Sequence, residues 1–149
     1  MTTVHATHAD AVLALYDAFG RGDVAAITPL LADDVSWDAD WADSFAQRTP
    51  IDYYLPRRGP AQVVEFFQLL AGFAVNHFAV QDVLVSANRV SAVIVIDVTL
   101  PHGGRYRDEE IHLWTFDADG RVSALRHYID TAKHLAAAAG EDTTRRPGS

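Results

Sequence analysis

A carboxylate stands near the centre of the most hydrophobic stretch of the chain. The segment VSAVIVIDVTL, residues 90–100, is almost entirely apolar or small, and Asp97 interrupts it. An unpaired buried carboxylate is costly, so it takes a proton, finds a partner or serves a reaction. His112 and His127 occur in later stretches of alternating hydrophobicity. An Asp–His pair fixes the imidazole tautomer and raises its basicity, so these residue types indicate a general base.

Hydrophobic periodicity predicts the elements that position these residues. In chain order we expect a helix that ends at Gly20, a helix from Asp23 through Leu31, a short strand in residues 33–40, an irregular segment over 40–58, a helix over 60–73, strands over 75–86, 89–100, 105–116 and 121–130, and a short helix over 131–140. The turn DADG between the last two strands favours a hairpin. A long irregular segment in a compact domain is typical of a functional lid.

Helices followed by a meander of strands predict the α+β class. We expect a cone-shaped α+β barrel, in which the N-terminal helices pack on a curved, mostly antiparallel sheet and enclose a pocket. Residues 1–149 are interpreted as a single domain, with frayed ends at about 1–7 and 140–149.

Composition narrows the class of partner and of chemistry. The net charge is −8, from 12 basic and 20 acidic residues, which argues against nucleic acid or an anionic membrane as partner. The sequence has no cysteine, no secretory leader pattern and no membrane-spanning apolar run, so a cytoplasmic protein is expected. It carries no HExxH, Walker or GxGxxG motif, so we expect no metal and no cofactor.

Strand alternation groups residues by face but does not say which face looks inward. Three such groups are Val93, Val95 and Asp97; Glu110, His112, Trp114 and Phe116; and Leu125, His127 and Ile129.

The order of elements resembles the nuclear transport factor 2-like superfamily over about residues 8–135. The segments ALYDAFGRGD, ADDVSW and LRHYIDT resemble, more narrowly, its ketosteroid-isomerase-related, SnoaL-like branch. This scaffold hosts isomerases, cyclases, epoxide hydrolases, dehydratases and binders, so the resemblance implies a fold more specifically than a reaction.

Partial similarity to limonene-type epoxide hydrolases implies roles for five positions, one of which, the amide partner of the water-holding aromatic, falls on Ala39. The IDV segment places one catalytic carboxylate on Asp97, and LRHYID places the second catalytic position on His127. The bridging arginine falls on Val95 and the water-holding aromatic falls on Trp37.

Resemblance to the ketosteroid isomerases implies a second set of site positions. Their oxyanion-hole tyrosine falls near Tyr16 and their oxyanion-hole acid on His112. Their general base falls near Ala39, between Asp38 and Asp40.

Both resemblances imply that Asp97, His112 and His127 share the concave face. We therefore expect Asp97 to pair with His127 as the base, and His112 with Tyr16 to stabilise an oxyanion. A buried structural pair is the alternative interpretation of Asp97 and His127. The expected substrate-binding residues are Trp37, Trp114, Phe116, Tyr53, Tyr54, Val95 and Glu110.

These residues suit a cofactor-independent acid–base enzyme of the isomerase, cyclase or epoxide-opening type. Its substrate would be a small hydrophobic molecule with a carbonyl or epoxide group. The alternative is a non-catalytic module that binds a hydrophobic ligand or a protein partner. The resemblance also implies a homodimer through the outer face of the sheet, where we place Ile94, Ile96, Val98, Ile111 and Leu113.

Overall fold

A computed structural model describes residues 7–48 and 51–145. Its elements are α1 (His8–Gly20), α2 (Val24–Ile27), η1 (Thr28–Leu30), β1 (Leu31–Trp37), η2 (Phe45–Arg48), η3 (Asp52–Tyr54), β2 (Arg57–Arg58), α3 (Gly59–Leu70), β3 (Ala74–Ser86), β4 (Arg89–Thr99), β5 (Arg105–Phe116), β6 (Val122–Tyr128) and α4 (Thr131–Ala138). The predicted frayed ends lie partly outside the described residues.

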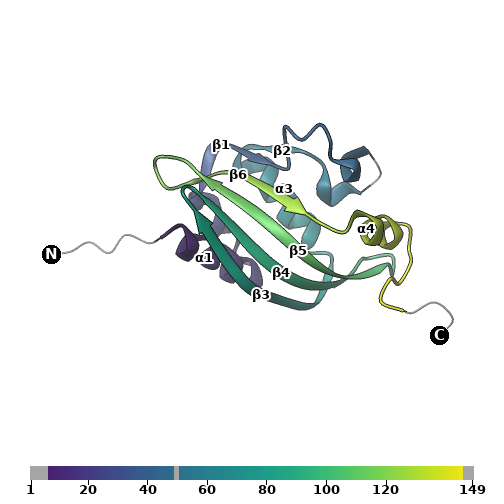
Figure 1. Cartoon of the computed structure of the whole chain (residues 1–149). Coiled ribbons are helices and arrows are strands. Elements are labelled where there is room, and N and C mark those ends of the chain that lie inside the picture. The colour runs from purple at the N-terminus through teal and green to yellow at the C-terminus, as the bar shows by residue number, and fades with distance from the viewer. Residues whose placement is uncertain (1–6, 49–50, 146–149) are drawn as a thin grey trace.

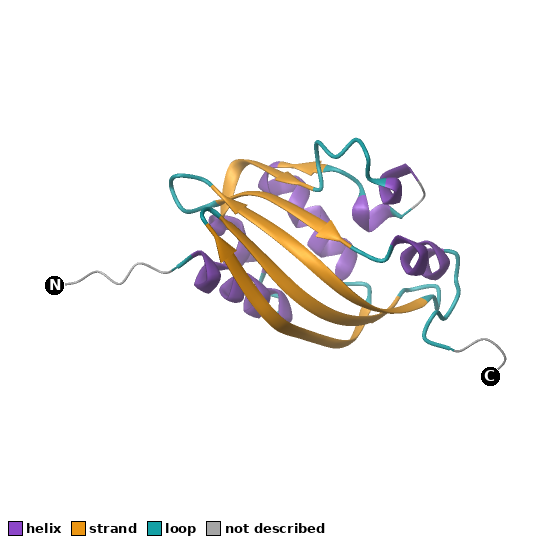
Figure 2. Ribbon diagram, in the orientation of Figure 1, coloured by secondary structure: helices purple, strands orange, loops and turns teal. Residues whose placement is uncertain are grey.

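The strands form one six-stranded sheet in the order β2-β1-β6-β5-β4-β3. Strand β1 pairs with β6 in parallel, and every other neighbouring pair is antiparallel. Helices α1 and α3 lie behind the curved sheet, and α4 lies beside the start of β5 (Figure 1, Figure 2). The predicted α+β class and the mostly antiparallel sheet are confirmed.

Each long helix buries one stripe of apolar residues against the sheet. Helix α1 buries Val12, Leu15 and Ala18, spaced three residues apart, and α3 buries Val63 and Phe66. This spacing places the buried side chains on one helical face, so their burial holds both helices over the concave side of the sheet.

Both ends of the described chain are tied to the fold. Thr7 caps α1 in a reciprocal capping box with Asp10. Near the other end, Arg105 N donates to Glu141 O and Thr143 N donates to Arg105 O, each at 2.9 Å.

Close packing fixes α4 against the start of β5. A Cβ atom on Gly104 would lie 1.9 Å from the backbone oxygen of Ala137, which is a severe overlap. Only glycine allows this approach, and the approach holds α4 beside the sheet.

The register of β4 on β5 corrects the expected faces of β4. Ile94 lies opposite Glu110, and Ala92 lies opposite His112, so the even-numbered residues of β4 share the concave face. The expectation that Val95 and Asp97 share the face of His112 is therefore wrong. Because side chains alternate with a period of two, a one-residue error turns the whole strand over.

The same correction applies to the expected outer patch. Ile94 and Val98 are buried, and Ile96 lines the internal cavity, so these three do not lie on the outer face. Ile111 does lie there and is 37% exposed, opposite Val93.

Among the described residues, no helix is both long and apolar enough to cross a membrane.

Candidate active site

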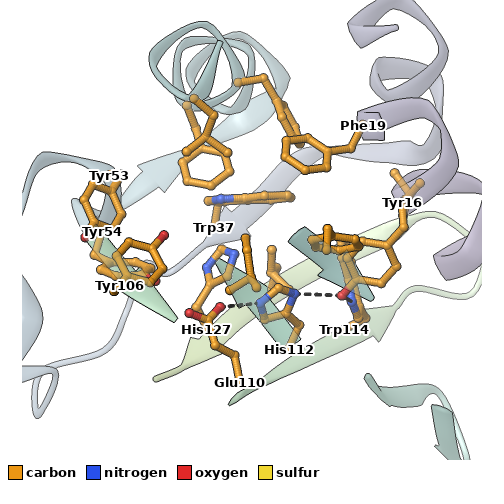
Figure 3. Close-up of a pocket in the computed structure, with 17 residues that line it drawn as sticks. Tyr16, Phe19, Trp37, Tyr53, Tyr54, Tyr106, Glu110, His112, Trp114 and His127 are labelled. Carbon is orange, nitrogen blue, oxygen red and sulfur yellow. Dashed lines mark hydrogen bonds and ion pairs between the residues drawn. The ribbon is translucent and has the colours of Figure 1, made fainter. Parts of the chain in front are cut away.

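A cavity of about 80 Å³ lies between the concave face of the sheet and helices α1 and α3. Since a water molecule needs about 10–15 Å³ of such space, the cavity has room for several waters or a small organic group. Its wall is mainly aromatic, and Figure 3 shows Glu110, His112 and His127 rising into it from the strands. Few polar groups in an apolar enclosure are typical of a small-molecule site.

The cavity continues toward the surface between α1, α3 and β3. Phe19, Phe67, Leu70 and Phe78 line both the cavity and a larger surface pocket there. A ligand longer than the inner cavity can therefore extend outward past these four apolar side chains.

The end of β1 holds His127 in place. Trp37 is the last residue of β1, and the next residue, Asp38, has a φ of 51°, in the left-handed region that Asp tolerates better than most residues. Asp38 N donates to Leu125 O at 2.8 Å, which prolongs the pairing with β6. The Asp38 carboxylate then accepts from His127 N at 2.8 Å and from His127 Nδ1 at 2.6 Å.

This two-point contact defines the state of His127. The carboxylate can only accept, so Nδ1 carries a proton and Nε2 is left for a ligand. Nε2 has no hydrogen bond to any residue that the structure describes, and His127 lines the cavity. Burial opposes charge on the ring, but Asp38 overcomes it and raises the pKa of His127.

His112 is saturated by its neighbours. Its Nε2–H donates to Glu110 Oε1 at 2.9 Å, because a carboxylate only accepts. Its Nδ1 then accepts from the Tyr16 hydroxyl at 2.7 Å, and that hydroxyl accepts from Trp114 Nε1 at 3.0 Å. Both ring nitrogens of His112 and the hydroxyl proton of Tyr16 are therefore already engaged in hydrogen bonds within the protein.

The pKa values of the two cavity imidazoles are shifted in opposite directions. Their ring centroids lie only 4.7 Å apart. Burial lowers the pKa of His112 against the opposing effect of Glu110, whereas Asp38 raises that of His127. Burial also raises the pKa of Tyr16, which keeps its phenol protonated. Neighbouring groups whose pKa values are pushed apart are typical of acid–base sites.

A second buried network lies behind His112. His134 Nε2 lies 2.8 Å from Asp108 Oδ2 and 3.0 Å from Glu110 Oε2, and its Nδ1 lies 3.1 Å from the Tyr53 hydroxyl. Burial alone would raise the pKa of Glu110, but hydrogen bonds from His112 and His134 lower it. Despite burial, the two carboxylates raise the pKa of His134.

The same three residues have the composition of a metal site. Ligand atoms of Asp108, Glu110 and His134 lie within 4.8 Å of one another. Both carboxylates lie within hydrogen-bonding distance of His134 Nε2 and raise the pKa of that imidazole, so the same contacts also fit a buried hydrogen-bond network.

Asp97 lies on the opposite face of the sheet from His127. Its carboxylate receives two hydrogen bonds from Arg105, both at 2.9 Å, and one from Asn76 Nδ2 at 3.1 Å. Arg107 Nη1 lies 3.8 Å away. The expected pairing of Asp97 with His127 is therefore wrong, because the register turns Asp97 toward these convex-face partners.

Most of the remaining predicted site residues meet at the cavity. Those that line it are Tyr16, Trp37, Tyr53, Tyr54, Glu110, His112, Trp114 and His127. Val95 lies on the convex side with Asp97. Phe116 is buried near the start of α1, where its ring stacks on His8 at 4.3 Å, so it is not part of the cavity wall.

Sequence reasoning missed three residues of the site. Asp38 was placed only as a neighbour of Ala39, although an Asp that directly follows a strand ending in Trp37 was a signal for a carboxylate at the sheet edge. Tyr106 did carry a signal, because alternation along β5 places it on the same face as Glu110 and His112. His134 carried none, because α4 reaches the sheet only through tertiary packing.

Several solved structures of other proteins have a fold similar to that of this chain. A nuclear transport factor 2-like protein of unknown function from Burkholderia pseudomallei is 23% identical, with a TM-score of 0.70 over 85% of this chain and 92% of that chain. TerC, co-crystallised with polyporic acid, is 22% identical, with a TM-score of 0.67 over 84% and 92%. A Mycobacterium tuberculosis protein in complex with estradiol-17β-hemisuccinate is 15% identical, with a TM-score of 0.67 over 83% and 94%.

At these identities, the likeness shows the nuclear transport factor 2-like fold alone. Related folds also occur in a candidate isomerase from Rhodopseudomonas palustris, a candidate polyketide cyclase from Xanthomonas campestris and a designed 17-OHP binder. No curated protein matches the chain. The SnoaL-like domain profile matches residues 12–125, which is most of the sequence. The chain therefore belongs to the SnoaL-like domain family.

Proposed function

We propose that this protein moves a proton at a carbon atom next to a carbonyl group in a small hydrophobic molecule. It would act without a cofactor, as an isomerase or a cyclase. The observation that carries the proposal is the clamp of Asp38 on His127, which leaves Nε2 unbonded in an aromatic cavity. This arrangement is that of an oriented general base.

The reaction begins with neutral His127. The α C–H bond breaks, its proton passes to Nε2, and its electron pair forms the enolate while the carbonyl oxygen takes up the negative charge. Asp38 stabilises the imidazolium that forms, since it accepts from Nδ1 at 2.6 Å. In an isomerisation the imidazolium returns the proton to another carbon. In a cyclisation the enolate carbon attacks a second carbonyl, whose oxygen becomes an alkoxide, and the imidazolium gives its proton to that alkoxide.

The surroundings favour an apolar substrate. The rings of Trp37, Tyr54 and Phe66 lie within 6.0 Å of the His127 ring, measured between centroids. Such walls exclude water and so strengthen the electrostatic effect of Asp38. Ligands of proteins with the same fold, polyporic acid and an estradiol derivative, also combine a hydrophobic ring system with oxygen atoms.

Epoxide opening receives less support than isomerisation or cyclisation. The resemblance assigned one of its two catalytic carboxylates to Asp97, and Asp97 faces away from the cavity. His127 is accompanied by Asp38 instead.

Exchange of α-protons for deuterium tests the proposal without knowledge of the natural substrate. The protein is incubated with acetophenone and with 2-cyclohexenone in D₂O, and loss of the α-proton signals is followed by NMR. We expect exchange above the buffer rate for wild type and for His102→Ala, which removes an exposed histidine. We expect no exchange above buffer for His127→Ala. Equal rates in wild type and His127→Ala would refute the assignment.

A binding module is the second candidate function, and the designed 17-OHP binder with this fold favours it. A module of this kind would bind ketones without exchanging their protons. Its affinity would survive Asp38→Asn, and neither the wild type nor the variant would exchange protons. An enzyme would also keep binding in this variant, but its exchange would slow by about 10-fold.

The homodimer implied by the resemblance remains a proposal, with a corrected surface. Val93, Val95, Ile111 and Leu113 now form the apolar part of the convex face. Light scattering of wild type and Ile111→Glu would test it: a dimer that dissociates in the variant supports this surface, and a monomeric wild type refutes it.

A further inference from the structure

Trp37 carries a buried hydrogen-bond donor without an acceptor. The residue is 1% exposed, and its Nε1 has no hydrogen-bond partner among the described residues. Trp114, by contrast, donates from Nε1 to the Tyr16 hydroxyl at 3.0 Å. Leaving a buried donor unpaired costs about 1–3 kcal/mol, so such a group in a native structure needs an explanation.

The indole of Trp37 cannot easily turn to find an acceptor elsewhere. Its ring centroid lies 5.4 Å from that of Phe66, 5.7 Å from that of Phe67 and 5.8 Å from that of Trp114. These rings surround it as part of the cavity wall. Close packing of this kind holds a side chain in one rotamer, so the direction of the N–H bond is fixed.

The indole that carries this donor is a direct neighbour of the His127 imidazole. The two ring centroids are 6.0 Å apart, and the rings meet edge to face. Figure 3 shows the nitrogen-bearing edge of the Trp37 indole above the His127 imidazole. A ligand atom beside Nε2 of His127 therefore has an indole N–H close to its neighbouring atoms.

The residues expected to form an oxyanion hole are less suited to that task. The Tyr16 hydroxyl donates its proton to His112, and His112 donates its own proton to Glu110. To contact a ligand oxygen, either residue must first break a buried hydrogen bond. Trp37 has no bond to break, so it offers the ligand a net gain of one hydrogen bond.

We propose that Trp37 donates its indole N–H to the oxygen of the substrate carbonyl. This inference rests on the proposed function and names a further residue that touches the substrate. As the α-proton moves to His127 and charge builds on the carbonyl oxygen, the hydrogen bond from Trp37 strengthens. The ligand class is a flat, uncharged ketone with its oxygen facing Trp37 and its α-carbon facing His127.

Indole NMR resonances of the wild-type protein provide the first test. The chain has three tryptophans, and the spectra of Trp37→Phe and Trp41→Phe assign their N–H signals. The probes are acetophenone and α-methylstyrene, which have nearly the same shape but differ in the carbonyl oxygen. We expect acetophenone to move the Trp37 proton downfield and α-methylstyrene not to do so. A Trp37 signal that acetophenone does not move downfield at its solubility limit overturns the proposal.

Affinity ratios provide the second test. The preference for acetophenone over α-methylstyrene should fall about fivefold in Trp37→Phe, the loss expected for one hydrogen bond of about 1 kcal/mol. Trp41→Phe is the matched control, because Trp41 packs on Tyr128 and Arg126 outside the cavity. A preference that survives in Trp37→Phe but disappears in Tyr54→Phe would assign the donor to Tyr54 and overturn the proposal.

The two proposals fail in different ways. Both binding tests need no turnover, and in the NMR test the shift is measured on the wild-type protein, with the variants used only to assign its signals. A downfield Trp37 signal without deuterium exchange would refute the catalytic proposal and leave the hydrogen bond in place. Exchange that depends on His127 without a shift at Trp37 would refute this inference alone.

Discussion

The concave and convex faces of the sheet each hold a buried carboxylate, and the two carboxylates have different partners. On the concave side Asp38 binds an imidazole, His127, whose other nitrogen faces a cavity. On the convex side Asp97 binds the Arg105 guanidinium through two hydrogen bonds. Both carboxylate side chains are almost fully buried, at 2% and 6% exposure.

The difference lies in what the partner can still do. A guanidinium keeps its charge at every physiological pH, and Arg105 holds the pKa of Asp97 below its usual value. An imidazole can gain and lose a proton near neutral pH, and Asp38 adjusts that equilibrium. Burial of a carboxylate is therefore a weak sign of function, whereas a titratable partner with an unbonded nitrogen in a cavity is a stronger one.

The largest expected effect is on the exchange rate, which should depend on the Asp38–His127 pair and not on the Asp97–Arg105 pair. His127→Ala should lower the rate of α-proton exchange by about 10²-fold, since the base is lost. Asp97→Asn should leave the rate within about twofold, because electrostatic influence across a sheet is weak compared with direct proton transfer. NMR exchange rates measure both. A large loss of activity in Asp97→Asn, with the fold retained, would contradict the claim that only the concave-face carboxylate takes part in the reaction.

Asp38→Asn should change the pH profile as well as the rate. Exchange needs neutral His127, so the rate should rise with pH through a pKa above the ordinary histidine value of about 6.5. In the variant the carboxylate is gone and burial remains, so the midpoint should move to lower pH. Its plateau at high pH should also fall, by about 10-fold, because the imidazole tautomer is no longer held. An unchanged midpoint would show that Asp38 does not tune His127.

Asp97→Asn should act on stability instead. We expect the free energy of unfolding at pH 7 to fall by about 1–2 kcal/mol, since the charged hydrogen bonds from Arg105 weaken. The pKa of Asp97 is lowered by Arg105, so its stabilisation is present above about pH 3.9 and is lost as the pH falls through the folded-state pKa. Urea unfolding at pH 7 and at acidic pH measures this. The difference in unfolding free energy between variant and wild type should become smaller at acidic pH.

Arg107→Gln should give the smallest effect. The Arg107 side chain is 53% exposed and lies 3.8 Å from Asp97, without a hydrogen bond to it. Exposed ion pairs contribute about 0–1 kcal/mol, so the unfolding free energy should change by less than about 0.5 kcal/mol. A larger loss in urea unfolding would mean that Asp97 depends on both arginines.

Much of the concave site could be predicted from alternation within single strands. Glu110, His112 and Trp114 were correctly grouped on one face of β5, and they line the cavity together. The face of β4 could not be obtained in this way, because its alternation fits either orientation. The resemblance chose the orientation that turns Asp97 inward, and the register with β5 turns it outward.

The sequence by itself determined the order of helices and strands and the α+β class, because those follow from local hydrophobic periods and turn residues. The tertiary structure alone decided which carboxylate meets His127. Asp38 is 89 residues away in the chain, and it reaches His127 only because β1 pairs in parallel with β6. No local pattern encodes that pairing, and it converts a residue at the end of a strand into the partner of the candidate base.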